Sequence, residues 1–215
     1  MEKENNKLKG AFVERDLSWM YFNHRILQEA EKKDIPVLER MTFLGIYSNN
    51  LDEFFRVRIA SLNRIAQSKD KTLKNDRERA KRTIKDINHL NSCYNKEFEK
   101  AVQEITEELE QKGIRLLHEN QLNDEQKDFI QRFYLEKLNG STNPIWLSQI
   151  KEIGATADDG IFLAIKRMEW IEGKKKPKID YALIAMPDKE IGRFVRLPKS
   201  DEKENIMFLD DVIRY

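Results

Sequence analysis

Two apolar helical patterns meet at residues 48–58, SNNLDEFFRVR, and the expected fold depends on how this stretch is read. Apolar side chains repeat at helical spacing on both sides of it. Between the two patterns, Asn49 and Asn50 are residue types that favour helix ends over helix interiors. The pattern therefore predicts that one helix ends near Tyr47 and that the next begins at Leu51.

The segment before this joint predicts a first helix that begins at a cap on Asp16 or Ser18. Asn23 is expected to lie off its apolar stripe. Pro36 then suits the first residue of a second helix. Connections of a few residues predict helices that pack as antiparallel neighbours. The expected stripe of the first helix, spaced by three and four residues, consists of Trp19, Phe22, Ile26 and Ala30.

A long helix is expected over residues 76–112. Its heptad-like apolar stripe stops at Gly113, a residue type that commonly ends helices. At about 1.5 Å per residue, such a helix would be roughly 50 Å long. Residues 1–112 are thus predicted to form a helical N-terminal domain. The stripe consists of Ile84, Ile87, Asn91, Tyr94, Phe98, Ala101, Ile105 and Leu109 (or Glu108).

Residues 113–215 are expected to form a smaller α+β domain. Asn123 or Asp124 is expected to cap a helix there, and Asp210 to cap a last helix at which the chain stops. That abrupt end predicts a fragment of a longer protein. The complete expectation is an α+β protein in which an antiparallel helical bundle with one long helix precedes a small α+β domain. The expected strands are 114–117, a hairpin of 160–168 and 179–186 joined by a charged turn at 172–177, and then 194–197 and 205–208.

Composition restricts the class of protein. The 215 residues are 40% apolar and 36% charged with a net charge of +1, so bulk electrostatics do not indicate a polyanion-binding protein. Cys93 is the single cysteine, which excludes a disulfide framework and a CxxC metal site. The polar residues 1–15 read as a loose tail without the apolar core of a secretory signal, and no apolar run is long enough for a membrane span. A cytoplasmic protein is expected.

No self-contained active site is visible in the sequence. His24, His89 and His118 have no Cys, Asp or second His at metal-ligand spacing. No phosphate-cradling glycine loop and no nucleophile elbow is present. The basic residues between 69 and 85 leave RNA binding as a minor alternative, but acidic residues dilute them and no aromatic residues interleave. A solvated helix face is the favoured interpretation of that stretch, and no nucleic-acid partner is expected.

The joint itself allows two interpretations. In the first, it is a capped turn in which Arg56 and Arg58 pair with Asp52, Glu53 or Glu39. In the second, amide side chains and free backbone N–H groups at a helix N-terminus form a polar pocket for a ligand with phosphate or a heterocycle. The two arginines would then supply forked donors to anionic oxygens.

Two stretches of the chain resemble type 1 polyphosphate kinases. They are residues 15–30, RDLSWMYFNHRILQEA, and residues 36–58, PVLERMTFLGIYSNNLDEFFRVR. Residues 113–215 are similar to the head domain of that family more loosely, through residues 181–184, 193–198 and 208–215. Residues 143–154 depart from the proline-rich pattern of the family, so no site is transferred onto them.

The resemblance implies an enzyme that reversibly moves the terminal phosphate of ATP onto polyphosphate through a phosphohistidine. It also implies that the histidine and the Mg²⁺ ligands lie in C-terminal domains outside this chain. Asn50 matches a position that contacts the ATP nucleotide in the family. Asn49, Arg56 and Arg58 are secondary candidates for nucleotide binding. The resemblance also implies that the head domain makes dimer contacts. It implies a parent enzyme in the cytoplasm, which is compatible with peripheral membrane association.

The chain is accordingly expected to contribute nucleotide contact and scaffolding for a dimer and a tunnel, and to lack kinase activity alone. The competing hypothesis is a non-catalytic interaction module. In that case the helix over residues 76–112 docks a partner, and Asn50 is only a helix cap.

Overall fold

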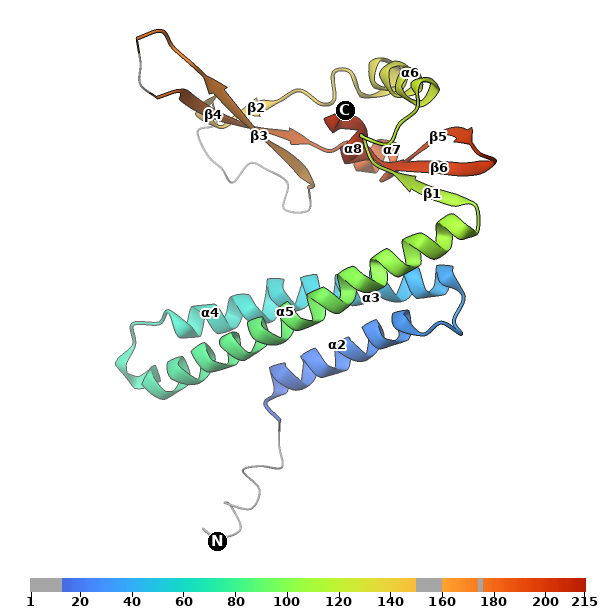
Figure 1. The fold of residues 1–215 in the computed structure, drawn as a ribbon. Helices are drawn as coiled ribbons and strands as arrows, with labels where there is room; N and C mark the ends of the chain where they lie inside the picture. Colours follow the sequence, from blue (N-terminus) through green and yellow to red (C-terminus); the bar gives the residue numbers. More distant parts are fainter. Residues whose placement is uncertain (1–12, 150–159, 174–175) are drawn as a thin grey trace. The chain divides into compact units, whose positions relative to one another are not determined.

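The computed structural model describes residues 13–149, 160–173 and 176–215. They belong to two units, Met1–Leu109 and Glu110–Tyr215 (Figure 1). Three expectations fall in whole or in part outside the described residues. These are the loose tail at 1–15, the end of the divergent stretch 143–154 and the tip of the charged turn at 172–177.

The first unit is built from three rods of helix that lie side by side (Figure 1). One rod is α2, Arg15–Glu31. The second is continuous and consists of α3, Val37–Phe54, a π-helical turn, Phe55–Ile59, and α4, Ala60–Ala66. After a 3₁₀ turn, Lys71–Leu73, the third rod is the 38-residue α5, Lys74–Gln111.

The predicted joint at residues 48–50 is wrong, because these residues lie inside α3. An asparagine in a helix interior costs at most about 0.7 kcal/mol relative to alanine, so modest tertiary contacts outweigh its preference for helix ends. The irregularity occurs later, at the π-helical turn. There the buried side chains Phe54 and Ile59 are five residues apart, instead of three or four.

The predicted start and stripe of the first helix also need correction. Glu14 caps α2, because its Oε2 accepts hydrogen bonds from the backbone N–H groups of Asp16 (2.7 Å) and Leu17 (3.2 Å). Pro36 is the residue before α3 and not its first residue. Phe22, expected in the core, is 60% exposed. The buried face of α2 instead consists of Asp16, Met20, Asn23, Leu27 and Ala30.

The prediction of one long helix is confirmed, with its apolar stripe facing the other helices of the first unit. Rings of α5 stack on this bundle: Tyr94 on His24 at 3.8 Å and Phe98 on Tyr47 at 5.6 Å between centroids. Gly113 has a φ of 89°, as expected for a residue that ends a helix. The buried residues of α5 are Ala80, Thr83, Ile87, Tyr94, Ala101, Ile105 and Leu109.

The second unit contains two three-stranded sheets. In the first sheet, β1 (Ile114–Leu117) runs parallel to β6 (Lys203–Phe208), which pairs antiparallel with β5 (Phe194–Ser200). In the second, β4 (Lys178–Ala185) lies between β2 (Ile145–Trp146) and β3 (Phe162–Glu169), and both pairings are antiparallel. The expected hairpin is therefore confirmed.

Short helices complete the second unit. They are α6, Asp124–Phe133, with a π-helical turn, Tyr134–Leu138; a 3₁₀ turn, Leu147–Gln149; α7, Asp188–Ile191; and α8, Leu209–Arg214. Asn123 caps α6 in a capping box with Gln126, which settles the choice between Asn123 and Asp124. Asp210 is not a cap, because α8 already begins at Leu209. The core comprises Leu117, Leu122, Ile130, Leu138, Met186, Val195, Leu197, Met207, Leu209 and Val212.

The expected α+β organisation, a helical bundle with one long helix followed by a small α+β domain, is confirmed. None of the helices in the described ranges combines the length and the apolar character needed to cross a membrane.

Candidate functional site

Residues in the middle of α3 are joined to α2 by two consecutive hydrogen bonds of asparagine side-chain amides. Asn50 donates from Nδ2 to Asn23 Oδ1 at 3.1 Å. Asn23 in turn donates from its own Nδ2 to the backbone carbonyl of Tyr47, also at 3.1 Å. Asn23 is 1% exposed, whereas Asn50 is only half-buried. The chain of bonds thus runs from the protein interior to a surface where Asn50 is reachable.

That surface is a cleft of about 350 Å³ between α2 and the α3 rod. Ligand pockets typically measure about 300–1,000 Å³, so the cleft is large enough for part of a small molecule. The Trp19 and Phe54 rings stack at 4.0 Å between centroids and form an apolar wall of the cleft. The lining residues are Trp19, Phe22, Asn50, Glu53, Phe54, Val57 and Arg58.

Arg58 is held at the edge of this cleft by Asp16. Its Nε and one terminal nitrogen donate to the two carboxylate oxygens of Asp16, each at 3.0 Å. Burial raises the pKa of Asp16, and the negative charge of Glu14 raises it further, while Arg15 acts in the opposite direction. The forked contact with Arg58 favours the ionised carboxylate, so this pair keeps a charge inside the bundle.

Arg58 also lines a second opening, of about 460 Å³, between the α2 start, α4 and α5. Asp16 and Glu14 line it together with Asp76 and Arg79. Among the described residues, the lining of this opening has both charge signs and no aromatic side chain, so it offers less to a heterocyclic ligand than the cleft at Asn50 does.

The other predicted site residues are placed differently. Asn49 is exposed and does not line the cleft. Arg56 pairs with Asp52 at 3.1 Å on the exposed side of the helix, which confirms one of the expected pairs. The expected pairing of Arg58 with Asp52, Glu53 or Glu39 is wrong, since its partner lies 42 residues earlier in the sequence. The pocket at a free helix N-terminus is wrong as well, because residues 48–50 are in a helix interior.

Sequence reasoning missed the contribution of α2 to this site. Asp16 and Asn23 are polar side chains on the buried stripe of α2, at the same spacing as the apolar Met20 and Leu27. A polar side chain on an otherwise apolar helical stripe points to a specific buried partner. That signal was available in the sequence, but it required choosing the stripe through Met20 and not the one through Trp19.

Besides its backbone carbonyl, Tyr47 contributes a buried side chain to the helical bundle. Its ring is 2% exposed, and its hydroxyl is buried without a hydrogen-bond partner among the described residues. Burial, the charge of Glu97 and the neighbouring Tyr94 raise the pKa of Tyr47 to about 12. The hydroxyl therefore stays neutral around physiological pH.

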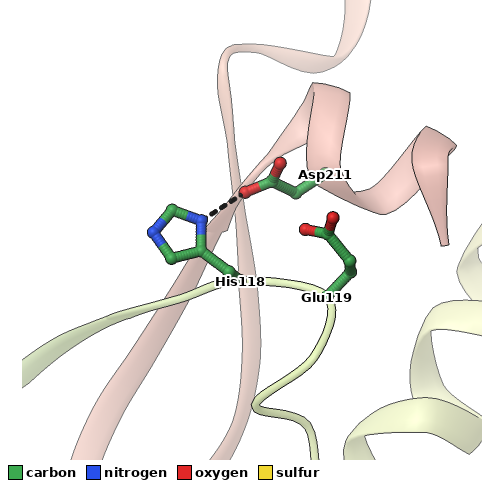
Figure 2. Close-up of side chains that lie close together, drawn as sticks. All are labelled: His118, Glu119 and Asp211. Atoms are coloured by element: carbon green, nitrogen blue, oxygen red, sulfur yellow. Dashed lines mark hydrogen bonds and ion pairs between the residues drawn. The ribbon is translucent and has the colours of Figure 1, made fainter.

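A second cluster lies in the other unit, where His118 and Glu119 follow β1 and Asp211 lies on α8 (Figure 2). His118 Nδ1 and Asp211 Oδ2 are 2.9 Å apart, and the three candidate ligand atoms lie within 4.8 Å of one another. Arg214 pairs with Asp211 at 3.4 Å and with Glu119 at 3.6 Å. Its guanidinium already balances both carboxylates, so the cluster is best understood as ion pairs that fasten α8 to the segment after β1.

Two family models match the chain one after the other. The polyphosphate kinase N-terminal domain matches residues 12–117, and the polyphosphate kinase middle domain matches residues 125–215. Together they account for nearly the whole sequence.

Individual proteins agree with these models. A polyphosphate kinase of Vibrio parahaemolyticus is 32% identical over 210 residues, which is 95% of this chain and 29% of that protein. The polyphosphate kinase of Escherichia coli strain K12 is 34% identical over 207 residues, again 95% of this chain and 29% of the relative. The crystal structure of polyphosphate kinase from Porphyromonas gingivalis superposes with a TM-score of 0.78 at 28% identity, and covers 94% of this chain and 29% of that one. The chain thus spans less than a third of the length of these relatives. It belongs to the polyphosphate kinase family.

Proposed function

We propose that this chain supplies the nucleotide-contacting helical part of a polyphosphate kinase, with its middle-domain segment as scaffold. The parent activity is the reversible transfer of the terminal phosphate of ATP to polyphosphate through a phosphohistidine. The side chains that transfer the phosphate would lie in the part of the parent enzyme that this chain does not cover. The observation that carries the proposal is the cleft in which Asn50, the residue matching the family's nucleotide contact, meets an apolar wall and an arginine.

The lining of the cleft suggests a role for each of its parts. The amide of Asn50 offers a hydrogen bond to the edge of a nucleobase. Phe22 and Val57, which are 60% and 52% exposed, offer apolar surface to the faces of the base. Arg58 retains one terminal nitrogen beyond its two bonds to Asp16, and its charge favours the anionic end of a nucleotide. These residues would bind and orient ATP and would exclude water, without taking part in bond making.

Further features of the parent enzyme belong to the same proposal. Mg²⁺ would neutralise phosphate charge, and it would be bound outside this chain. In the described residues, the cluster at His118 is the group with metal-ligand spacing, and Arg214 already balances its carboxylates. Polyphosphate is the proposed second substrate. Assembly into a homo-oligomer through the middle domain, and a cytoplasmic location, complete the proposal.

The decisive experiment is ATP binding to the 215-residue chain, measured by titration of its amide NMR signals. We expect Asn50→Ala to weaken binding about five- to tenfold, the value of one neutral hydrogen bond. Asn49→Ala is the matched control, because it removes an exposed amide from the same helix turn, and it should change affinity less than twofold. Equal affinities for wild type and Asn50→Ala, with helix content unchanged, would reject the nucleotide role. They would favour the interaction-module alternative, in which Asn50 has only a structural function.

A further inference from the structure

The amide chain behind the cleft has a fixed direction. The backbone carbonyl of Tyr47 can only accept a hydrogen bond, so the side chain that meets it must present its NH₂ group. Asn23 therefore turns Nδ2 toward Tyr47 and Oδ1 toward Asn50. Asn50 must then present its own NH₂ group to Asn23. The orientation of both amides follows from one backbone oxygen.

This arrangement leaves the carbonyl edge of Asn50 for the cleft. Asn50 lines the cleft, and within the described part of the chain its Oδ1 has no hydrogen-bond partner. We infer that Asn23 is a positioning residue that makes Asn50 an outward acceptor, so that the cleft selects nucleobases with an exocyclic amino group. The inference rests on the proposed nucleotide role and specifies the class of base.

Rotating Asn50 to present its NH₂ group outward is unfavourable. It would place the Asn50 oxygen against Asn23 Oδ1, now 3.1 Å from the Asn50 nitrogen. If Asn23 also rotated to avoid this contact between two oxygens, its Oδ1 would lie against the carbonyl of Tyr47. Asn23 is 1% exposed, so in both cases water cannot replace the hydrogen bond that Asn23 Oδ1 loses. The buried member of the pair therefore holds the exposed one in a single orientation.

The group at C6 of a purine base is therefore expected to decide which nucleotides bind best in the cleft. Adenine carries an NH₂ group at C6, where hypoxanthine carries a carbonyl oxygen and unsubstituted purine carries hydrogen. In a common pose, the carbonyl of hypoxanthine would face the Asn50 oxygen, whereas unsubstituted purine would leave that oxygen without a donor. Once a bound base covers the Asn50 oxygen, leaving that acceptor without a donor is disfavoured by more than the value of the bond itself.

The test compares ATP, purine riboside triphosphate and ITP on the wild-type chain by NMR titration. We expect the two analogues to bind about tenfold more weakly than ATP. If ATP binds and both analogues bind equally well, the inference is overturned while the proposed function stands. If none of the three binds at the cleft, both fail.

A variant then tests the positioning role. Asn23→Leu removes the orienting amide and leaves Asn50 free to rotate, so we expect the ratio of ITP to ATP dissociation constants to fall from about ten to less than three. Loss of stability alone would not change this ratio among folded molecules. Asn49→Ala should retain the wild-type ratio. A ratio that is unchanged in folded Asn23→Leu overturns the positioning role, and if that variant does not fold, the wild-type comparison of the three nucleotides still decides the inference.

Discussion

At the scale of single residues, the candidate site depends on polar side chains that lie inside the helical bundle. Asp16 is 4% exposed, yet it accepts both hydrogen bonds of a guanidinium. Asn23 is buried and uses both ends of its amide. Such groups are stable inside a protein only when their partners are present, and for this reason each of them orients a neighbour at the cleft.

The pair of Arg58 and Asp16 gives a prediction with a defined pH dependence. Arg58→Met leaves the buried carboxylate without its partner, so we expect a loss of about 2 kcal/mol in the free energy of unfolding at pH 7. Burial raises the folded-state pKa of Asp16, so the folded state takes up the proton before the unfolded state as the pH falls. The deficit of the variant should therefore shrink as the pH falls from 7 to about 4, because the carboxyl becomes neutral in the folded protein before it does in the unfolded chain.

Urea unfolding of wild type and Arg58→Met at pH 7 and at about pH 4 measures this effect. Arg56→Met is the control, because it removes a solvent-exposed pair with Asp52 and should cost no more than about 0.5 kcal/mol. The double variant with Asp16→Asn should recover part of the loss at pH 7. A deficit that stays constant with pH would show that Asp16 carries no uncompensated charge in the variant.

At the scale of elements, one arginine connects three helices. Arg40, on α3, is fully buried and donates from Nε to the carbonyl of Ala30, in the last turn of α2, at 2.7 Å. It donates from another nitrogen to Glu108 of α5, also at 2.7 Å. A carbonyl at a helix C-terminus has no partner in its own helix, so this contact satisfies a group that the bundle would otherwise bury unpaired.

We expect Arg40→Met to destabilise the first unit by about 3 kcal/mol, because it leaves the Ala30 carbonyl and the Glu108 carboxylate without this donor. Hydrogen exchange should speed up most in the last turn of α2. Lys33→Met is the matched control, since the pair of Lys33 with Glu104 is solvent-exposed and should contribute about 0.5 kcal/mol or less. Equal losses for the two variants would argue against a special role for Arg40.

At the scale of the whole molecule, no histidine of the described residues lines the cleft at Asn50. His24 lies 2.6 Å from Glu97 and stacks on Tyr94, so its ring is held in the bundle. His118 pairs with Asp211 beside Arg214, and His89 is exposed on α5. The matched family models are the polyphosphate kinase N-terminal and middle domains.

We therefore expect no stable phosphorylation when the 215-residue chain is incubated with γ-labelled ATP and Mg²⁺. Label retained in alkali and lost in acid, the behaviour of phosphohistidine, should not exceed that of a variant in which His24, His89 and His118 are all replaced by glutamine. Incorporation at any one of the three would contradict the proposed division of labour between this chain and the rest of the parent enzyme.

The sequence by itself determined the features that depend on near neighbours along the chain. The period of apolar residues in α5 and the hairpin of β3 and β4 depend on near neighbours, and both are found as predicted. Asn123, one of the two residues predicted to cap α6, is the cap in the structure. The family signature over residues 36–58 was equally legible, since it needs only the order of residues.

The tertiary structure alone decided how that signature is built. Asn49 and Asn50 locally favour a helix end, but α3 continues through them, because the bond to Asn23 joins residues 27 positions apart. The pair of Asp16 with Arg58 spans 42 positions, and no local preference specifies it. What looked like a joint between two helices is the interior of one. Its polar side chains are oriented by partners on another helix, since buried hydrogen-bonding groups must be satisfied wherever the fold brings a partner within reach.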